Sequence, residues 1–337
     1  MTALASHLTT FLCKHLPAER AASPHTCDTY AYCFQLLVCF VARRRGIKPS
    51  QIEVEQLDAP VVLAFLEHLE RDRKNSARTR NARLAAIHAF FRFLEYRLAS
   101  SLDQSRQIHA IPMKKTDEAL VAYLTRDELR ALLDAPDPRV ISGARDRAML
   151  HLAFAAGLRV SELVGLSLDQ LDLRTPPSIH IIGKGRRERR LPLWKETTAV
   201  LRAWLAVRPR DGDHELFLNA RGRAMTRSGF EYIIATHVVT AARQQPSITS
   251  KRVTPHVLRH TCAMHTLQAT RDVRKVSLWL GHASLQSTEV YLRTDPTEKL
   301  EALNTMTPPT LKPGRFRPPD RLLAMLRSGT RAENYAE

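Results

Sequence analysis

Apolar residues recur at helical spacing through about the first third of this 337-residue chain. In the clearest stretch, Tyr30, Phe34 and Leu37 fall three or four positions apart, which places them on one face of a helix. The same spacing predicts helices over about residues 3–15, 26–44, 60–71 and 77–98. The pattern therefore indicates an all-helical N-terminal domain over residues 1–105.

A second pattern begins after residues 106–120, where periodicity is lost and Ser, Pro and a Lys-Lys pair favour a linker. Thr125 and Glu128 then have the spacing of a capping box that opens a helix. Further on, two segments of strand character flank a Gly-Lys-Gly turn, which predicts a hairpin over residues 178–193. We expect residues 121–305 to form an α+β domain, so that the fold class is mainly α with a small antiparallel β-sheet.

Residues 306–337 extend beyond this predicted domain and differ from it in composition. They begin with a Pro-rich, basic segment that favours an extended spacer. Leu322, Leu323 and Leu326 then give residues 320–327 one apolar side. A helix this short needs a groove to be stable, so we expect the tail to dock on a protein surface.

The charge balance is strongly basic. The chain has 51 Lys and Arg residues against 34 Asp and Glu residues, a formal net charge of +17 and a pI near 10.2. Such an excess favours a polyanionic partner, with nucleic acid first and an anionic membrane surface second. We expect no membrane association, because no apolar run reaches the ~18–20 residues of a membrane span and the N-terminus has no secretory-signal pattern.

The five cysteines are odd in number and form no C-x-x-C pair. This usage argues against a disulfide framework and against a zinc site, and it favours a reducing compartment. We therefore expect a cytoplasmic protein without a bound metal.

A basic segment over residues 71–83 leads into the predicted fourth helix. Cations at a helix N-terminus oppose the helix dipole, so their accumulation needs another cause. A phosphate backbone lying across this segment is one cause, and a solvated charged face is the alternative. We expect DNA contact here through Lys74, Arg78, Arg80 and Arg83.

The densest chemistry lies in residues 254–291. Thr254 and Pro255 suit the N-cap and first turn of a helix, on which His256 and Arg259, three positions apart, share one face. A Leu-Gly-His turn and a short helix then present two more polar side chains, His282 and Tyr291. Phosphodiester cleavage needs a nucleophile, positive charge on the non-bridging oxygens and proton transfer, and this stretch holds candidates for all three.

Two upstream residues complete an ordered set. Arg159 follows a helix-ending glycine, and Lys184 lies between two glycines at the hairpin tip. The order Arg, Lys, His-x-x-Arg, His, Tyr resembles the tyrosine recombinases, also called the phage integrase family. The matching strings are AAGLRVSEL, GKGRRERRLPL, HVLRHTCA and LGHASLQS, followed by Tyr291. The resemblance covers the second domain, and the helical first domain looks like the family's core-binding domain.

The resemblance implies a role for each residue of the set. Tyr291 would attack the phosphorus, while the guanidinium groups of Arg159 and Arg259 stabilise the negative charge of the transition state. His256 would act as general base or hydrogen-bond a phosphate oxygen, and His282 would be a further donor. Lys184 would protonate the departing 5′ oxygen. Glu162 is expected to position the site, and Arg186, Arg187, Arg189 and Arg190 to contact phosphates, whereas His260 and His265 read as structural.

The resemblance implies a site-specific DNA recombinase that works through a 3′-phosphotyrosine intermediate and needs neither metal, cofactor nor ATP. It also implies a nucleoid-associated protein of the bacterial cytoplasm. The implied partners are double-stranded DNA with inverted-repeat sites and further copies of the chain, two per site and four in synapsis. In such a tetramer the tail could exchange between neighbours. The alternatives are that its short helix packs on its own domain or that the tail is disordered. We expect a recombinase of a bacterial mobile element, with other recombinases of that element as candidate partners. The alternatives are a type IB topoisomerase-like enzyme and a non-catalytic DNA-binding accessory protein.

Overall fold

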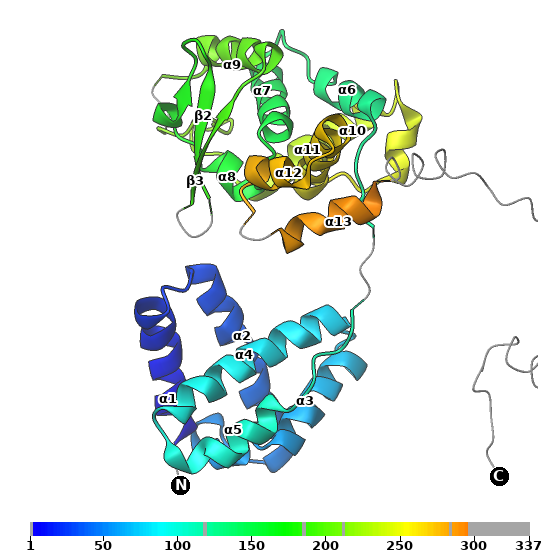
Figure 1. Ribbon diagram of the computed structural model, residues 1–337. Helices are drawn as coiled ribbons and strands as arrows, with labels where there is room; N and C mark the ends of the chain where they lie inside the picture. The colour runs from blue at the N-terminus through cyan, green and yellow to red at the C-terminus, as the bar shows by residue number, and fades with distance from the viewer. Residues whose placement is uncertain (1–2, 117–119, 184–186, 211–212, 283–284, 296–337) are drawn as a thin grey trace, which may run out of the picture. The chain divides into compact units, whose positions relative to one another are not determined.

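The computed structural model describes residues 3–116, 120–183, 187–210, 213–282 and 285–295. The chain divides into two compact units, Met1–Ala119 and Leu120–Glu337, and each has its own hydrophobic core (Figure 1). Residues 296–305 of the expected second domain, the tail over residues 306–337, Lys184 and Arg186 lie outside the described residues.

The first unit consists of helices, as the apolar periodicity predicts. Three of its helices begin at side-chain caps, in which Ser23, Asp58 and Ser76 accept backbone N–H groups of the first turn. Short 3₁₀ segments lie at Pro49–Gln51, Val54–Gln56 and Ala99–Ser101. The main elements are α1 (Leu4–Thr10), the π-helical η1 (Phe11–Glu19), α2 (Pro24–Arg45), α3 (Ala59–Arg71), α4 (Ala77–Glu95) and α5 (Leu102–His109).

Aromatic rings fill the core of this unit. Phe90 of α4 meets Phe34 of α2 with ring centroids 5.1 Å apart and Phe11 of η1 at 5.3 Å, both edge to face. All three rings are buried, so they hold α2, α4 and η1 together.

The predicted linker is shorter in the structure than in the sequence analysis. Residues 106–109 continue α5, and Ile108 and Ile111 are buried in the first core. Farther along, Lys114 forms an ion pair with Glu70 at 2.8 Å. The expectation that residue 106 begins the linker is therefore corrected, because this segment packs on α3 and α4.

The second unit is helical around a small sheet. Its three strands, β1 (Leu171–Asp172), β2 (Ser178–Ile182) and β3 (Glu188–Pro192), pair antiparallel in the order β1-β2-β3. The helices are α6 (Arg126–Asp134), α7 (Ile141–Ala155), α8 (Val160–Val164), α9 (Lys195–Val207), α10 (Arg227–Ala241), α11 (Pro255–Thr270), α12 (Val273–Leu280) and α13 (Gln286–Thr294), with 3₁₀ segments at Leu168–Gln170 and Pro246–Ser250. This composition confirms the fold class.

The predicted hairpin is present, and Ile182 pairs with Glu188 across its turn. Ile179 and Ile181 of β2 and Leu191 of β3 point into the core, which gives the sheet one buried face. The capping box at α6 is also present, because Thr125 and Glu128 bond each other's backbone N–H groups.

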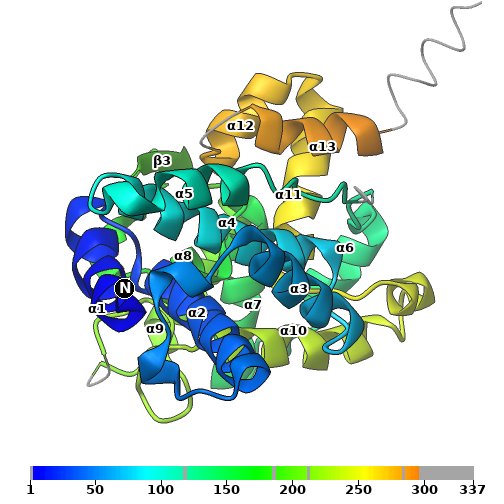
Figure 2. The same ribbon diagram turned by 90° about the horizontal axis from the view of Figure 1, so that it is seen from below.

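The last three helices lie side by side, with α11 deepest in the unit (Figures 1 and 2). One side of α11 is buried through Leu258, Ala263 and Met264. The N-terminal half of α11 and the end of α12 approach the turn between α7 and α8, where Gly157 lies next to Cys262 and Leu280. No described helix is long and apolar enough to cross a bilayer.

Candidate active site

Arg259 lies at the centre of the candidate site. Thr254 caps α11 by accepting the N–H of Val257, and Pro255 occupies the first turn, so the helix begins where the sequence predicts. Arg259 follows one turn later and is only 4% exposed. Its guanidinium donates to the carbonyl of Gly157 and, at 2.9 Å, to the carbonyl of Leu280. The side chain therefore joins the α7–α8 turn to the end of α12.

Gly157 makes this approach possible. Its φ of +55° is a left-handed conformation that favours glycine, and an added Cβ would lie 2.5 Å from Cδ2 of Leu280 and 3.1 Å from Sγ of Cys262. A larger residue would push α11 and α12 away from the turn. The glycine that ends α7 in the sequence therefore also sets the position of Arg259.

Glu162 accepts hydrogen bonds from two further arginines, Arg159 and Arg189. One of its oxygens accepts Nη1 of Arg159 at 2.8 Å, and the other accepts the Arg159 backbone N–H at 3.0 Å. Both oxygens also accept from the guanidinium of Arg189, at 3.2 and 2.8 Å. Burial alone would raise the pKa of Glu162, but these bonds and the positive charges keep its pKa below the usual value. Glu162 remains ionised and orients two cations.

The side chain of Arg189 is 9% exposed, in contrast to the phosphate contact expected for it. It lies on β3 with the buried Leu191, two positions along the strand and therefore on the same face. It also packs on Gly281, where an added Cβ would be 3.1 Å from its guanidinium. The expectation for Arg189 is corrected to that of a buried partner of Glu162.

Tyr291 lies inside the unit, with 1% of its surface exposed. Its hydroxyl is 3.0 Å from Nδ1 of His260, and the two rings meet edge to face with centroids 5.6 Å apart. Burial raises the pKa of Tyr291 to about 12, against the opposing effects of Arg259 and Arg159. Burial also lowers the pKa of His260 to about 4, helped by His256 and Arg259. At neutral pH the protonated phenol therefore lies beside a neutral imidazole, with which it shares a hydrogen bond.

His282 approaches Tyr291 from the α12–α13 turn. The two rings are nearly parallel, with centroids 6.4 Å apart. Nδ1 of His282 lies 2.8 Å from Oγ1 of Thr288, a buried residue of α13. Burial lowers the pKa of His282 to about 4, and Arg259 and Arg159 act in the same direction. His256, in contrast, is exposed on α11, with its ring 6.3 Å from that of His260.

The cations of the site also affect each other. Burial lowers the pKa of Arg259 to about 10, the charge of Arg159 adds to this effect and that of Glu162 opposes it. The two neighbouring guanidinium groups of Arg259 and Arg159 favour an anion bound between them, because a negative charge there stabilises both. Among the described residues, no group of three or more His, Cys, Asp or Glu side chains could hold a metal ion.

The structure thus brings together five of the predicted residues: Arg159, Glu162, Arg259, His282 and Tyr291. His256 lies on the exposed side of α11, the helix that also carries Arg259. Arg187 is exposed at the start of the return strand. Three contacts were not anticipated: His260 with Tyr291, Thr288 with His282 and Arg189 with Glu162. The alternation along β3 could have indicated Arg189, whereas the other two depend on the fold.

The basic segment of the first unit divides into exposed and buried members. Lys74 and Arg78 are exposed, as DNA contact requires. Arg80 is 4% exposed and donates to the carbonyl of Pro112 at 2.7 Å, so it is corrected to a structural residue. Arg83 is half-buried, donates to the carbonyl of Thr29 and stacks its guanidinium over Tyr32, so its main role is to join α4 to α2.

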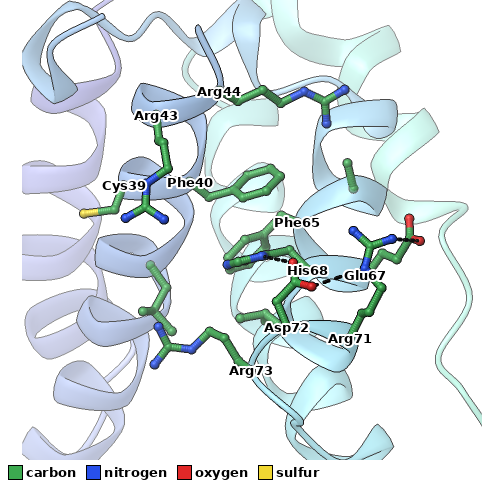
Figure 3. A pocket seen from close by; sticks show the side chains of 13 residues that line it. Cys39, Phe40, Arg43, Arg44, Phe65, Glu67, His68, Arg71, Asp72 and Arg73 are labelled. Atoms are coloured by element: carbon green, nitrogen blue, oxygen red, sulfur yellow. Dashed lines mark hydrogen bonds and ion pairs between the residues drawn. The ribbon is translucent and has the colours of Figure 1, made fainter. Parts of the chain in front are cut away.

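A pocket of about 480 Å³ between α2 and α3 extends the basic surface (Figure 3). Phe40 and Phe65 form its apolar wall, and the ring of His68 stacks on Phe40 with centroids 5.2 Å apart. The remaining polar lining includes Arg43, Arg44, Arg71, Asp72 and Arg73, of which Arg71 and Asp72 pair with each other. The sequence analysis did not single out these arginines of α2.

Comparisons with known proteins match both units. Residues 122–298, a little over half of the chain, fit the model of the phage integrase family, and residues 10–97 fit that of the phage integrase N-terminal SAM-like domain. The chain belongs to the phage integrase family. This tyrosine recombinase is an enzyme of DNA recombination, a class that cuts and rejoins DNA strands.

Several relatives cover nearly the whole recombinase. It is 44% identical to the integrase/recombinase y4rC of Sinorhizobium fredii, over 96% of this chain and 98% of the relative. It is 33% identical to the tyrosine recombinase XerC of Pelotomaculum thermopropionicum, over 85% of this chain and 92% of the relative.

Solved structures share the fold at lower identity. A XerH recombinase in a post-cleavage complex with palindromic difH matches 88% of this chain and 84% of its own, with a TM-score of 0.66 and 21% identity. The Tn1549 transposon integrase bound to transposon right-end DNA matches 88% of this chain and 99% of its own, with a TM-score of 0.65 and 17% identity. These similarities support the α+β assignment of the second unit.

Proposed function

We propose that this recombinase acts on a bacterial mobile element and cuts each strand through a 3′-phosphotyrosine at Tyr291. The observation that carries the proposal is the grouping of two guanidinium groups, of Arg159 and Arg259, with His282 and Tyr291. This grouping supplies a nucleophile beside a binding site for a phosphodiester anion. The y4rC relative and the fold shared with the Tn1549 integrase favour a mobile element.

In the proposed cleavage step, the Tyr291 oxygen bonds to phosphorus as the bond from phosphorus to the 5′ oxygen breaks. The guanidinium forks of Arg159 and Arg259 hold the non-bridging oxygens, where negative charge increases in the transition state. His256 acts as the general base that takes up the phenolic proton of Tyr291, and His282 adds a hydrogen bond to the same phosphate group. The departing 5′ oxygen takes its proton from Lys184. In ligation, a 5′-hydroxyl attacks the phosphotyrosine and the same bonds form and break in reverse.

The buried environment of Tyr291 supports a requirement for bound DNA in the cleavage step. A phenol with a pKa near 12 is almost fully protonated at neutral pH, so the unliganded site holds a weak nucleophile. Because the side chain is 1% exposed, DNA binding also has to make room for a phosphate beside the oxygen. We infer that cleavage depends on a correctly bound DNA site.

The partners follow from the same proposal. Double-stranded DNA with inverted-repeat sites would bind one copy per repeat, and two such dimers would form the tetramer of synapsis. Support comes from structures of the same fold: a lambda integrase dimer on a core site, a lambda integrase tetramer on a Holliday junction, and XerH on a palindromic substrate. Other recombinases of the same element would join such assemblies.

The decisive test is covalent trapping. DNA sites selected by the protein from a random library are rebuilt as nicked suicide substrates and incubated with the wild type and with Tyr291→Phe. We expect an adduct that survives denaturing gels and maps to Tyr291, and none for the variant, which should still bind the DNA. An adduct at another residue would contradict the assignment of the nucleophile.

Two further measurements separate the alternative functions. Exchange of strands between two labelled duplexes is expected for a recombinase, whereas relaxation of supercoiled DNA without exchange would indicate a topoisomerase-like enzyme. Binding without an adduct in the wild type would indicate an accessory protein.

A further inference from the structure

Thr288 contacts the imidazole of His282 inside the site. Its Oγ1 lies 2.8 Å from Nδ1 of the ring, and Thr288 has no measurable exposed surface. It precedes Tyr291 by three positions on α13, so the two side chains share a face of the helix. Thr288 and Tyr291 therefore meet the same imidazole from neighbouring positions.

The contact bears on which ring nitrogen carries the hydrogen. A neutral imidazole has one N–H and one lone pair, and the partner of one nitrogen favours one tautomer. Since burial lowers the pKa of His282 to about 4, the ring is neutral at pH 7. A hydroxyl that donates to Nδ1 leaves the hydrogen on Nε2, so that a neutral His282 can still donate to a phosphate oxygen.

Two helices hold the ring between them. The backbone N–H of His282 donates to the carbonyl of Ser277 at 3.1 Å, and Gly281, with a φ of +65°, closes α12 just before it. The backbone is thus fixed by α12, whereas the ring is fixed from α13 by Thr288. Rotation of the ring about its side-chain bonds would break the contact with Thr288.

We propose that Thr288 is a positioning residue that donates its hydroxyl hydrogen to Nδ1 of His282 and thereby presents Nε2–H to the scissile phosphate. The proposal rests on the proposed function, in which His282 contacts that phosphate. Thr288 would thus act through His282, and it lies on α13, the helix that carries the proposed nucleophile.

The first test compares a substitution that removes the hydroxyl with one that keeps it. Thr288→Val keeps the branched shape without the hydroxyl, and Thr288→Ser keeps the hydroxyl. The rate of single-turnover adduct formation on the suicide substrate should fall at least about tenfold for Thr288→Val, because losing one donor to the transition state costs about 10²-fold. For Thr288→Ser the rate should stay near that of the wild type. A valine variant at the wild-type rate, or a serine variant as slow as valine, would overturn the proposal.

The second test asks whether Thr288 acts through His282. If it does, the double variant His282→Ala/Thr288→Val should form adduct no more slowly than His282→Ala alone, because the partner is already gone. A residue that merely packs α13 beneath Tyr291 would slow the reaction further. A double variant clearly slower than the single one would therefore refute the proposal.

The third test does not depend on activity. In protein labelled with ¹⁵N at histidine, the nitrogen shifts of His282 should report the Nε2–H tautomer in the wild type and in Thr288→Ser, and a mixture in Thr288→Val. A Nδ1–H tautomer in the wild type would contradict the proposal. Thermal unfolding and DNA binding confirm that each variant is folded, and Thr288→Ala gives a second hydroxyl-free variant if valine is not accommodated.

Failure of this inference can be told from failure of the proposed function. If the wild type forms an adduct that Tyr291→Phe does not form, the proposed function holds, and the Thr288 variants decide the inference alone. If the wild type forms no adduct at Tyr291, the proposed function fails first.

Discussion

Replacement of Glu162 by glutamine should destabilise the second unit by about 3 kcal/mol at pH 7. The carboxylate is 4% exposed and accepts hydrogen bonds from Arg159 and Arg189, whose side chains are 31% and 9% exposed. Removing one partner of a buried ion pair costs about 3–5 kcal/mol, because the remaining charge is left uncompensated. We take the lower end, since glutamine keeps one acceptor oxygen and Arg159 reaches solvent.

The effect should depend on pH in a defined direction. The pKa of Glu162 is lower in the folded protein than its usual value of 4.5, so the stabilisation by its charge is complete above that pH. It is lost as the pH falls through the folded-state pKa. The difference in unfolding free energy between the wild type and Glu162→Gln should therefore be constant from pH 6 to 8 and shrink below about pH 4.5.

The assay is urea unfolding followed by tryptophan fluorescence. All three tryptophans, Trp194, Trp204 and Trp279, belong to the second unit, so the signal reports that unit alone. The control is Glu188→Gln, because Glu188 is 62% exposed where it pairs with His180, and its loss should cost about 0.5 kcal/mol or less. A cost below about 1 kcal/mol for Glu162→Gln, or a difference that persists unchanged to pH 3, would refute the reasoning.

Three further outcomes are expected. Arg78→Ala should weaken DNA binding and reduce the salt slope of fluorescence anisotropy titrations by about 1, whereas Arg80→Ala should lower stability by about 2 kcal/mol and leave that slope unchanged; equal slopes for both variants would contradict the burial argument. Arg259→Lys should bind DNA but form adduct about 10²–10³-fold more slowly, because an ammonium lacks the planar fork of donors, and a wild-type rate would disprove the clamp. In native protein at pH 8, mass spectrometry should find the exposed Cys39 alkylated but not Cys262, whose pKa burial raises to about 12; rapid labelling of Cys262 would contradict its burial.

The fold could be predicted where local signals agree. Helices α2, α3 and α4 have apolar periodicity and begin at side-chain caps, and the hairpin has a glycine-flanked turn, so their types and approximate bounds followed from the sequence. Helix α5 did not, because its buried apolar residue Ile108 is too isolated to make a pattern. Its position depends on packing against α4 instead.

The order of the motif residues in the sequence identified the residues of the site, but it did not predict which side chains contact each other. Arg80 was misassigned although Leu84 and Ile87, four and seven positions later, share its inward face. A charged side chain can be buried at such a position when a carbonyl accepts its hydrogen bond. For Arg80 this carbonyl belongs to Pro112, 32 positions away in the sequence. The pairing of His260 with Tyr291 spans 31 positions and has no local signal.

Arg189 has a consequence for the engineering of this recombinase. It bonds Glu162 on one side and packs on Gly281 on the other, and so connects the base of the hairpin to the turn that carries His282. At Gly183, next to this arginine, an added Cβ would lie 3.2 Å from Oε1 of Glu162 and 3.3 Å from Nη1 of Arg189, so a side chain there would crowd both partners. The hairpin therefore has a fixed pivot. We expect an exchange at Arg187, which is exposed just before β3 and lies outside the proposed catalytic set, to change contacts with DNA without moving Arg159 or Glu162.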